Sequence, residues 1–344
     1  MTDIIPEKRN KHPYFMYDMM RETPESLDIT RNVMENLDYS FLNSPLIFTG
    51  NGTAYHAAQI GAGFLKKTNL DYKFIQSYEL LNYELPSHGT LIGISNSGKT
   101  KSSIDSMIYF KKYAYVAGIT HYKDTPMDKI SDKSIIIDSD DKSLCNTKSF
   151  FDNAIASMYI AKNYSHLDIN INKIIDIIKD LIKTMDDKMH KIAKELSYVN
   201  AIFVLGAGPE YPVAREVAQK LKESTHINSE GIELEEFNHG CTSIIDDKSL
   251  LIILNNKTVS PRQKDIVNAC KVVKTKTLTV NGDGDFNINT PELDEYLDPV
   301  LNIVPLYYFA YYLAVEKNVN PDLLRFDETA YHDFDSIIFP PGAH

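Results

Sequence analysis

Short apolar runs alternate with helix-compatible stretches between Ser44 and about residue 163. The apolar runs have the length of buried strands, and the stretches between them, such as 53–67 and 100–112, have the mixed pattern of surface helices. A further helical block covers 148–163. This alternation predicts a parallel sheet with helices on both faces. The predicted strands are 46–49, 72–75, 90–95, 113–119 and 134–138.

The same pattern begins again at Asn200. Leu46–Tyr55 aligns without gaps on Ile202–Tyr211, and both read as a strand, then Gly-x-Gly, then a helix start with tyrosine. Leu91–Ser97 parallels Leu250–Asn256 in the same way. Such self-similarity indicates two copies of one unit. We therefore predict an α/β fold of two domains, each a parallel five-stranded sheet in a flavodoxin-like three-layer sandwich.

The segments outside the two copies are predicted to be helical. Residues 12–27 are expected to form one or two short helices that end before Pro24, because proline interrupts a helix interior. Residues 168–198 are expected to form one long helix between the copies. The predicted parts are a helical arm at 1–29, a first domain at 30–165, a connecting helix at 166–199, a second domain at 200–330 and a tail at 331–344.

Composition and charge argue against several classes of protein. The chain has 344 residues, a formal net charge of −11 and no long basic run, which argues against nucleic-acid binding. It has no apolar run of membrane-spanning length and no signal-like start, so we expect no membrane segment and a cytoplasmic location. Its cysteines, Cys145, Cys241 and Cys270, are widely spaced, so neither a disulfide framework nor a metal site is expected.

The strand predicted at 90–95 runs directly into Ser95-Asn96-Ser97-Gly98-Lys99-Thr100, which we call the hydroxyl turn. A helix predicted from Thr100 follows at once. The N–H groups of a helix's first turn, its positive dipole end and nearby hydroxyls together suit a phosphate. An ordinary strand–turn–helix joint with a Ser/Thr cap has the same pattern. In the second copy the corresponding Leu254–Lys257 lacks the hydroxyls and the glycine, so the halves are expected to have different roles.

The second half carries the titratable candidates. Glu216, Lys220 and Glu223 share one side of a predicted helix at i, i+4 and i+3 spacing, and His239 stands between asparagine and glycine. A solvated Glu–Lys face and a structural histidine are the ordinary alternatives. Beside a phosphate site, however, these groups are what an aldose–ketose shift requires. One group opens the sugar ring, and a carboxylate moves a proton between C1 and C2.

Several motifs in order resemble the tandem sugar isomerase (SIS) family. They are the two Gly-x-Gly-x-x-Tyr turns, the hydroxyl turn, Asn146–Phe150, and Lys220–Glu230 continuing to His239. Within that family, the chain is similar to the isomerase half of the glutamine–fructose-6-phosphate aminotransferases over roughly residues 12–325.

The resemblance implies roles for matching positions. The phosphate would be held by Ser95, Asn96, Ser97 and Thr100, and the sugar would be bordered by Gly52, Thr53, Asn146 and Arg325. The resemblance further implies that Glu223 is the base, that Lys220 lies beside it, and that His239 assists ring opening in a neighbouring subunit. It therefore implies a homodimer, and it implies no cofactor.

The chain also departs from the family pattern. We expect no glutaminase domain in it, because it begins without the nucleophilic cysteine of such domains. Ala54 stands where the family often has serine, and Asn238 where the aminotransferases have lysine. The aminotransferases close their site with a C-terminal lysine, but no lysine follows Lys317 here. The sequence does not decide whether Arg325, Tyr331 or His332 takes its place.

These observations lead to one favoured function and two alternatives. The favoured function is a phosphosugar isomerase or deaminase that acts on a hexosamine or ketohexose 6-phosphate, such as glucosamine or fructose 6-phosphate. The alternative within the enzyme class is a deglycase of a sugar 6-phosphate linked to an amino acid. The alternative of another class is a sugar-phosphate-binding regulator without turnover. The sequence leaves open which sugar is used, the direction of the reaction, and whether a separate glutaminase supplies ammonia.

Overall fold

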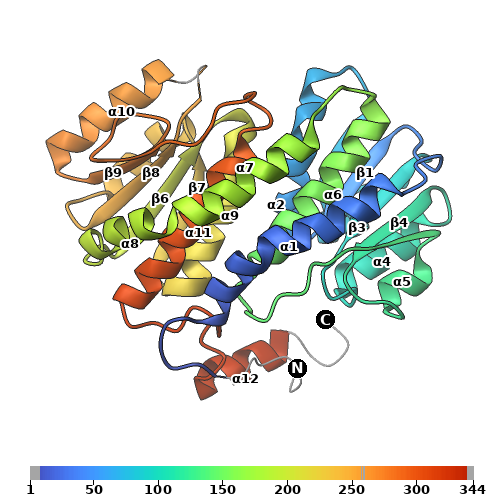
Figure 1. Cartoon of the computed structure of the whole chain (residues 1–344), viewed down its shortest axis with the longest axis horizontal. Helices are drawn as coiled ribbons and strands as arrows, with labels where there is room; N and C mark the ends of the chain where they lie inside the picture. The colour runs from blue at the N-terminus through green and yellow to red at the C-terminus, as the bar shows by residue number, and fades with distance from the viewer. Residues whose placement is uncertain (1–7, 257, 259, 339–344) are drawn as a thin grey trace. The chain divides into compact units, whose positions relative to one another are not determined.

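The computed structural model describes residues 8–256, 258 and 260–338, and it contains two parallel five-stranded sheets (Figure 1). The chain divides into two compact units. The first unit holds Lys8, Met19–Ile175 and the described residues from Arg325 onward, and the second holds Arg9–Asp18 and Asp176–Leu324.

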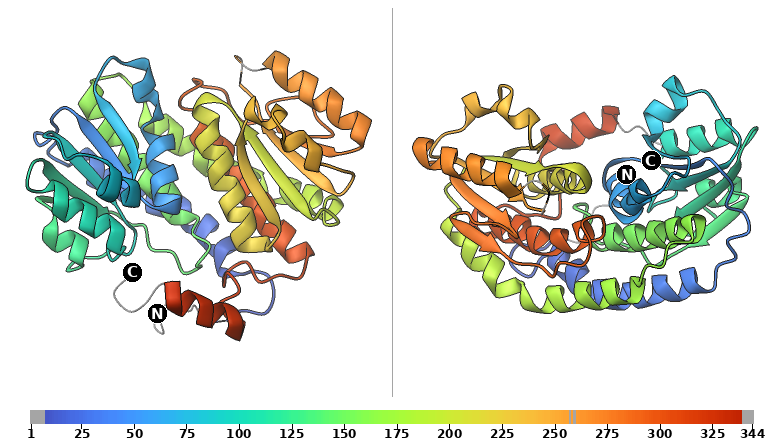
Figure 2. Two further views of the ribbon diagram at one scale, coloured as in Figure 1. Left: turned by 180° about the vertical axis from the view of Figure 1, so that it is seen from behind. Right: turned by 90° about the horizontal axis from the view of Figure 1, so that it is seen from above.

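The first unit is organised around the sheet with strand order β2-β1-β3-β4-β5. Leu46 of β1 lies opposite Tyr72 of β2 and Thr90 of β3, and every strand pair is parallel. All residues of β1 and β3 are buried, because helices lie on both sides of the sheet (Figure 2). The strands are β1 (Leu46–Gly50), β2 (Tyr72–Gln76), β3 (Thr90–Ile94), β4 (Tyr115–Thr120) and β5 (Lys133–Ile136). The helices are α2 (Gly52–Gly61), η1 (Gly63–Lys67), α3 (Ser77–Tyr83), α4 (Lys101–Phe110), α5 (Pro126–Ile130) and α6 (Lys148–Ser165).

The second unit repeats this arrangement. Its sheet has the order β7-β6-β8-β9-β10, which is the order of the first sheet when the strands of each unit are counted along the chain. The apolar run Ser249–Leu254 forms the fully buried central strand β8. The other strands are β6 (Ala201–Gly206), β7 (Asn228–Glu233), β9 (Lys276–Val280) and β10 (Phe286–Ile288). The helices are α8 (Asp186–Glu195), η2 (Gly208–Glu210), α9 (Tyr211–Thr225), η3 (Glu236–Asn238), η4 (Cys241–Ile244), α10 (Ser260–Val273) and α11 (Pro299–Glu316).

The α/β class and the two parallel five-stranded sheets are confirmed. The five strands predicted in the first half lie within two residues of β1–β5 at each end. No helix among the described residues combines the length and apolar character that a membrane span needs. Of the predicted tail, residues 331–338 lie in α12 (Thr329–Ile338), and 339–344 are outside the described residues.

The expectation of short helices ending before Pro24 is wrong. A single helix, α1 (Phe15–Glu35), runs through Pro24. Proline removes the backbone N–H that would otherwise bond the Met20 carbonyl, and in the same turn the Thr23 hydroxyl donates to the Met19 carbonyl at 2.9 Å. Beyond the proline, Ser26 and Thr30 donate to the buried carboxyl group of Asp152 on α6 at 2.5 and 2.7 Å. Tertiary contacts therefore keep the helix continuous where local propensity favours a break.

The single long connecting helix is also a wrong prediction. Two helices, α7 (Ile171–Thr184) and α8, meet at Met185. At the end of α7 the Thr184 hydroxyl donates to the carbonyl of Asp180 at 2.8 Å, and Asp186 and Asp187 lie in the first turn of α8. Acidic side chains favour a helix N-terminus through the helix dipole, so the sequence contained this start signal.

Candidate functional site

The hydroxyl turn lies between β3 and α4, and its two ends are joined by hydroxyl groups. Ser95 Oγ is 3.0 Å from Thr100 Oγ1, and the Gly98 N–H donates to the Ser95 carbonyl at 3.0 Å. Thr100 is the N-cap residue of α4 but makes no side-chain capping bond. The first-turn N–H groups of α4 have no acceptor within the helix, so they point outward at the positive end of the helix dipole. This arrangement can bind an anion such as phosphate.

Glycine is required at the centre of this turn. Gly98 has φ +63°, a conformation that side chains with a Cβ rarely adopt. A Cβ at this position would lie 2.4 Å from Thr125 Oγ1 and 2.7 Å from Thr120 Oγ1. The close approach of the turn to these two threonines therefore depends on the missing side chain.

The other polar side chains of the turn are partly engaged by the protein. Asn96 Oδ1 accepts a hydrogen bond from Ser139 Oγ at 2.7 Å, so its NH₂ group is the part suited to a ligand oxygen. Ser97 Oγ accepts from the Lys99 N–H at 3.2 Å, and its O–H can still donate to a ligand. Both side chains can therefore donate a hydrogen bond to a phosphate oxygen.

The turn that follows β1 is tied to the hydroxyl turn. Asn51 donates from Nδ2 to Ser102 Oγ and Ser103 Oγ, at 3.0 and 2.9 Å, in the first turn of α4. Gly52 and Thr53 open α2 directly after Asn51. Strands β1 and β3 are neighbours at the point where the strand order reverses, which is where open parallel sheets place their ligands. The structure thereby brings the predicted residues Gly52 and Thr53 beside the phosphate candidates.

Asn146 lies in the loop before α6, and its side chain is folded onto that loop. Its amide, oriented by the hydrogen-bond network, donates to the carbonyls of Ser143 and Leu144 at 3.0 and 3.2 Å. The loop is held by Asp141, whose Oδ2 accepts the N–H groups of Thr147 and Ser149 at 3.2 and 2.8 Å. Burial raises the pKa of Asp141 above its ordinary value. The loop is therefore held by a buried side chain within it, and no local pattern in the sequence points to this role of Asp141.

A row of charged side chains runs along α9 in the second unit. Glu216 and Lys220 are almost fully buried, with side chains 0% and 1% exposed, and Glu223 at the end of the row is 16% exposed. Lys220 Nζ lies 2.6 Å from Glu223 Oε2 and 3.8 Å from Glu216 Oε1. A buried ammonium needs such carboxylate partners, because an unpaired buried charge is strongly destabilising.

Two further residues orient this row. Gln219 donates to Glu223 Oε1 at 2.7 Å, so both oxygens of that carboxylate are fixed by neighbours on the same helix. The buried hydroxyl of Tyr307 on α11 donates to Glu216 Oε1 at 2.7 Å. Gln219 could have been found from its i, i+4 spacing to Glu223. Tyr307 could not, because nothing local relates it to α9.

His239 follows the short helix η3 and is exposed. Its side chain is 68% accessible, and Nε2 lies 4.0 Å from Glu235 Oε1. Gly240 has φ +124° and starts the next turn. The histidine is therefore presented to solvent within its own unit.

The tail candidates contact one another. Arg325 forms a two-pronged ion pair with Glu328, with both nitrogen–oxygen distances 2.8 Å, and its guanidinium lies 3.8 Å from the centre of the Tyr331 ring. His332 packs edge-on against Phe326, with ring centres 5.1 Å apart. Arg325 thus already has an anionic partner within its own segment.

The predicted site residues fall into two groups. The hydroxyl turn, Gly52, Thr53, Asn146 and the tail candidates belong to the first unit. Lys220, Glu223 and His239 belong to the second.

Within the described part of the chain, no group of three or more His, Cys, Asp or Glu residues is arranged to hold a metal ion.

The second group lies in a segment with a recognised family signature. Residues 195–317 match the family model of the SIS domain. The match extends from the end of α8 to α11 and includes all of the second sheet. The matched segment therefore contains the charged row of α9 and His239. The duplicate SIS domain expected in the first half remains a prediction.

Curated relatives of the chain are aminotransferases of greater length. The glutamine–fructose-6-phosphate aminotransferase of Pyrococcus horikoshii is 28% identical over 92% of this chain and 57% of its own length. The corresponding protein of Bacteroides thetaiotaomicron is 26% identical over 92% of this chain and 58% of its own length. The chain thus spans less than two thirds of these relatives, and it is similar to their isomerase domain.

Solved structures share the fold. The C-terminal domain of the Francisella tularensis glucosamine-fructose-6-phosphate aminotransferase has a TM-score of 0.77 at 19% identity, covering 92% of this chain and 100% of that one. A putative phosphosugar isomerase from Clostridium difficile has a TM-score of 0.79 at 22% identity, covering 93% and 97%. A glucosamine-6-phosphate deaminase from Thermotoga maritima has a TM-score of 0.72 at 18% identity, covering 89% and 96%. At these identities the likeness establishes the α/β fold.

Proposed function

We propose that this chain is a phosphosugar isomerase or deaminase acting on a hexosamine or ketohexose 6-phosphate. The observation that carries the proposal is the pairing of Lys220 with Glu223 at the partly exposed end of an otherwise buried charged row. A carboxylate whose two oxygens are held by Gln219 and Lys220 has a fixed orientation, and it is still accessible to a small molecule. Fixed orientation and access are what a general base requires.

In this proposal the catalytic residues divide the steps. His239 moves the proton of the anomeric hydroxyl to the ring oxygen, so that the bond between the anomeric carbon and the ring oxygen breaks and the open-chain carbonyl forms. Glu223 then takes the proton from C2 and returns it to C1, or the reverse, through an enediol- or enamine-type intermediate, and Lys220 keeps the carboxylate in place. For glucosamine 6-phosphate, water then releases the nitrogen, and the balance is glucosamine 6-phosphate plus water to fructose 6-phosphate plus ammonia.

The first half has the role of binding the phosphate in this proposal. Ser95, Asn96, Ser97 and Thr100 supply donors for it, and the turn that contains Gly52 and Thr53 is tied to theirs by Asn51. The first half is then a second SIS domain, with phosphate binding and proton transfer divided between the copies. Support comes from the identical strand order of the two sheets and from the aligned turns after β1 and β6.

The test is replacement of the proposed base. Glu223→Gln keeps the size and one carbonyl oxygen, so it should lower turnover of glucosamine 6-phosphate by about 10²–10⁴-fold while sugar-phosphate affinity stays within a few-fold. The matched control is Glu230→Gln, the same change at an exposed carboxylate on β7. Turnover is followed by the release of ammonia and fructose 6-phosphate. Unchanged turnover in Glu223→Gln would remove Glu223 from the mechanism.

The same assay separates the alternative functions. Release of an amino acid, rather than ammonia, from a sugar 6-phosphate linked to that amino acid would identify a deglycase. Tight binding of all these compounds with no product would identify a regulator. Either outcome contradicts the proposed reaction.

A further inference from the structure

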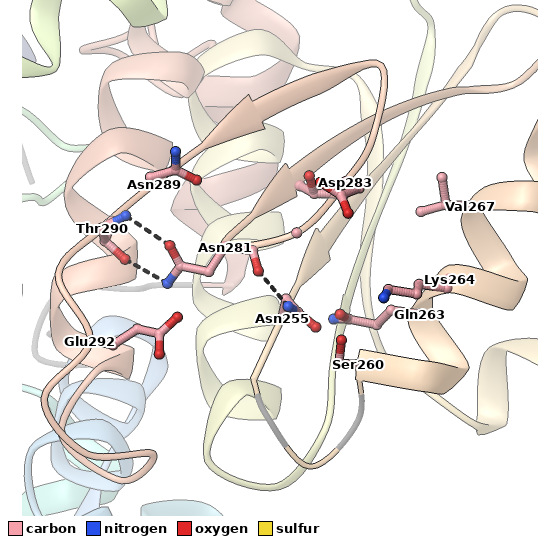
Figure 3. Close-up of a pocket in the computed structure, with 12 residues that line it drawn as sticks. Asn255, Ser260, Gln263, Lys264, Val267, Asn281, Asp283, Asn289, Thr290 and Glu292 are labelled. Carbon is pink, nitrogen blue, oxygen red and sulfur yellow. Dashed lines mark hydrogen bonds between the residues drawn. The ribbon is translucent and has the colours of Figure 1, made fainter.

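A polar pocket lies at the carboxyl end of the second sheet, away from α9. Its volume is about 340 Å³, within the range of small-ligand sites, and it lies between the ends of β8 and β9 and the first turns of α10. Figure 3 shows Asn281 at its centre, with Asn255, Gln263 and Lys264 on one side and Thr290 and Glu292 on the other. The proposed reaction uses none of these residues.

Buried hydrogen bonds lead from this pocket into the protein in one direction. Asn281 Nδ2 donates to Thr290 Oγ1 at 2.9 Å, and Thr290 Oγ1 donates to Asn302 Oδ1 at 2.5 Å. Asn302 Nδ2 then donates to Glu210 Oε1 at 2.7 Å. Glu210 is the last residue of this series. Burial raises the pKa of its carboxyl group to about 8, so the group is neutral below that pH. The series fixes the orientation of each amide along it.

The pocket end of the series lacks one donor. Asn255 donates from Nδ2 to the Asn281 carbonyl, as drawn in Figure 3, and this bond determines which way its amide faces. Among the described residues, its Oδ1 is buried and has no hydrogen-bond partner. The neighbouring Gln263 donates from Nε2 to the Leu254 carbonyl at 2.6 Å, and no hydrogen bond among the described residues joins it to Asn255 Oδ1. A buried carbonyl without a donor is destabilising, so a ligand that donates here gains more than one that only accepts.

The charges at the rim indicate what kind of donor fits. Among the described residues that line the pocket, two carboxylates, Asp283 and Glu292, and one ammonium, Lys264, are charged, so the negative charges outnumber the positive. This balance favours a cationic or neutral ligand over a phosphate. It differs from the hydroxyl turn, which occupies the corresponding place after β3 in the first unit.

We propose that this pocket is a second binding site, and that its ligand is an unphosphorylated amino sugar. An ammonium or hydroxyl group donates to Asn255 Oδ1, Asp283 and Glu292 stabilise the ammonium charge, and the remaining hydroxyls bind the polar floor. The volume accommodates one monosaccharide, since it equals that of about eleven waters at ~30 Å³ each.

Calorimetric titration of the full chain with glucosamine, and with glucose as the uncharged analogue, tests this site. We expect saturable glucosamine binding that is weaker for glucose. Asn255→Ala should weaken it about tenfold through the lost acceptor. Because Asn255→Ala also removes a bond to Asn281, the exposed rim variant Glu292→Gln provides a second test, with an expected loss of about threefold to tenfold. The matched control Lys264→Gln removes the opposite charge and should leave binding equal or tighter.

The outcome is separable from that of the proposed reaction. Glu223→Gln should bind glucosamine as the wild type does, because the pocket is formed by other residues. Binding that is lost in Glu223→Gln and kept in Asn255→Ala and Glu292→Gln would assign glucosamine to the proposed active site and overturn the inference. Absence of saturable glucosamine binding to the wild type would also overturn it, whatever the result of the turnover assay.

Discussion

At the scale of single residues, the hydroxyl turn depends on a position where no side chain fits. Gly98 combines a positive φ with a contact distance to Thr125 that leaves no room for a methyl group. The sequence shows a glycine in a turn, which allows close approach of a ligand. Only the structure shows that the close neighbours are the hydroxyls of two threonines. Replacement of the glycine is therefore expected to push the turn away from these two threonines.

Gly98→Ala should weaken phosphate-dependent binding by tenfold or more and lower the free energy of unfolding by about 1–3 kcal/mol, because the new Cβ adds both backbone strain and a clash. Calorimetric titration with fructose 6-phosphate measures the affinity, and urea unfolding measures the free energy of unfolding. Gly63→Ala is the matched control, since a Cβ there meets no atom within 4 Å. Wild-type affinity in Gly98→Ala would show that the phosphate does not bind at this turn.

At the scale of elements, the buried carboxyl group of Asp152 holds α1 against α6. Asp152 is fully buried and accepts hydroxyls from Ser26 and Thr30, on the far side of Pro24 from the start of the helix. Burial raises its pKa to about 8, against an ordinary value of 3.8. A helix that the sequence predicts to break at proline is thus held by a contact between residues more than a hundred positions apart. No local pattern contains that contact.

The raised pKa of Asp152 makes stability depend on pH in a defined direction. Between pH of about 4 and 8 the folded protein retains a proton that the unfolded chain has released, so this group's contribution to stability falls as pH rises, by up to ~1.4 kcal/mol per pH unit. Asp152→Asn cannot ionise, so its free energy of unfolding relative to wild type should increase steadily from pH 5 to pH 8.

Urea unfolding at pH 5, 6, 7 and 8 measures this difference. The exposed Asp180→Asn on α7, whose side chain is 78% accessible, is the matched control and should follow the wild type across the range. Parallel pH profiles for wild type and Asp152→Asn would contradict the raised pKa.

At the scale of the whole molecule, the two sheets share one strand order, and their functional side chains differ. In the first unit the central strand β3 is followed by the hydroxyl turn, and the second unit carries the charged row and an exposed histidine. The exposure of His239 suits a residue that completes the site of another subunit. A homodimer in which His239 acts across the interface is therefore part of the proposed function.

Mixing two inactive variants tests that arrangement. If Glu223 and His239 of one site come from different subunits, Glu223→Gln and His239→Ala should each be inactive, but a mixed dimer has one site with both native residues. After random exchange of subunits in equal amounts, we expect about a quarter of wild-type turnover. Sedimentation analysis checks that the mixture is dimeric. Recovery no greater than the sum of the two variants alone would place both residues in the same subunit's site.

The sequence by itself determined the alternation of strands and helices, the repeat, and the residue types of the hydroxyl turn and of α9, because hydrophobic period, helical spacing and turn chemistry are local properties. Tertiary structure alone decided that α1 continues through Pro24, that Tyr307 orients Glu216, and that Asn255 is left with a buried acceptor at a polar pocket. Each of these depends on a hydrogen bond, or on the lack of one, between segments brought together by packing. Such pairings are fixed by the arrangement of whole helices and strands, which no short stretch of sequence specifies.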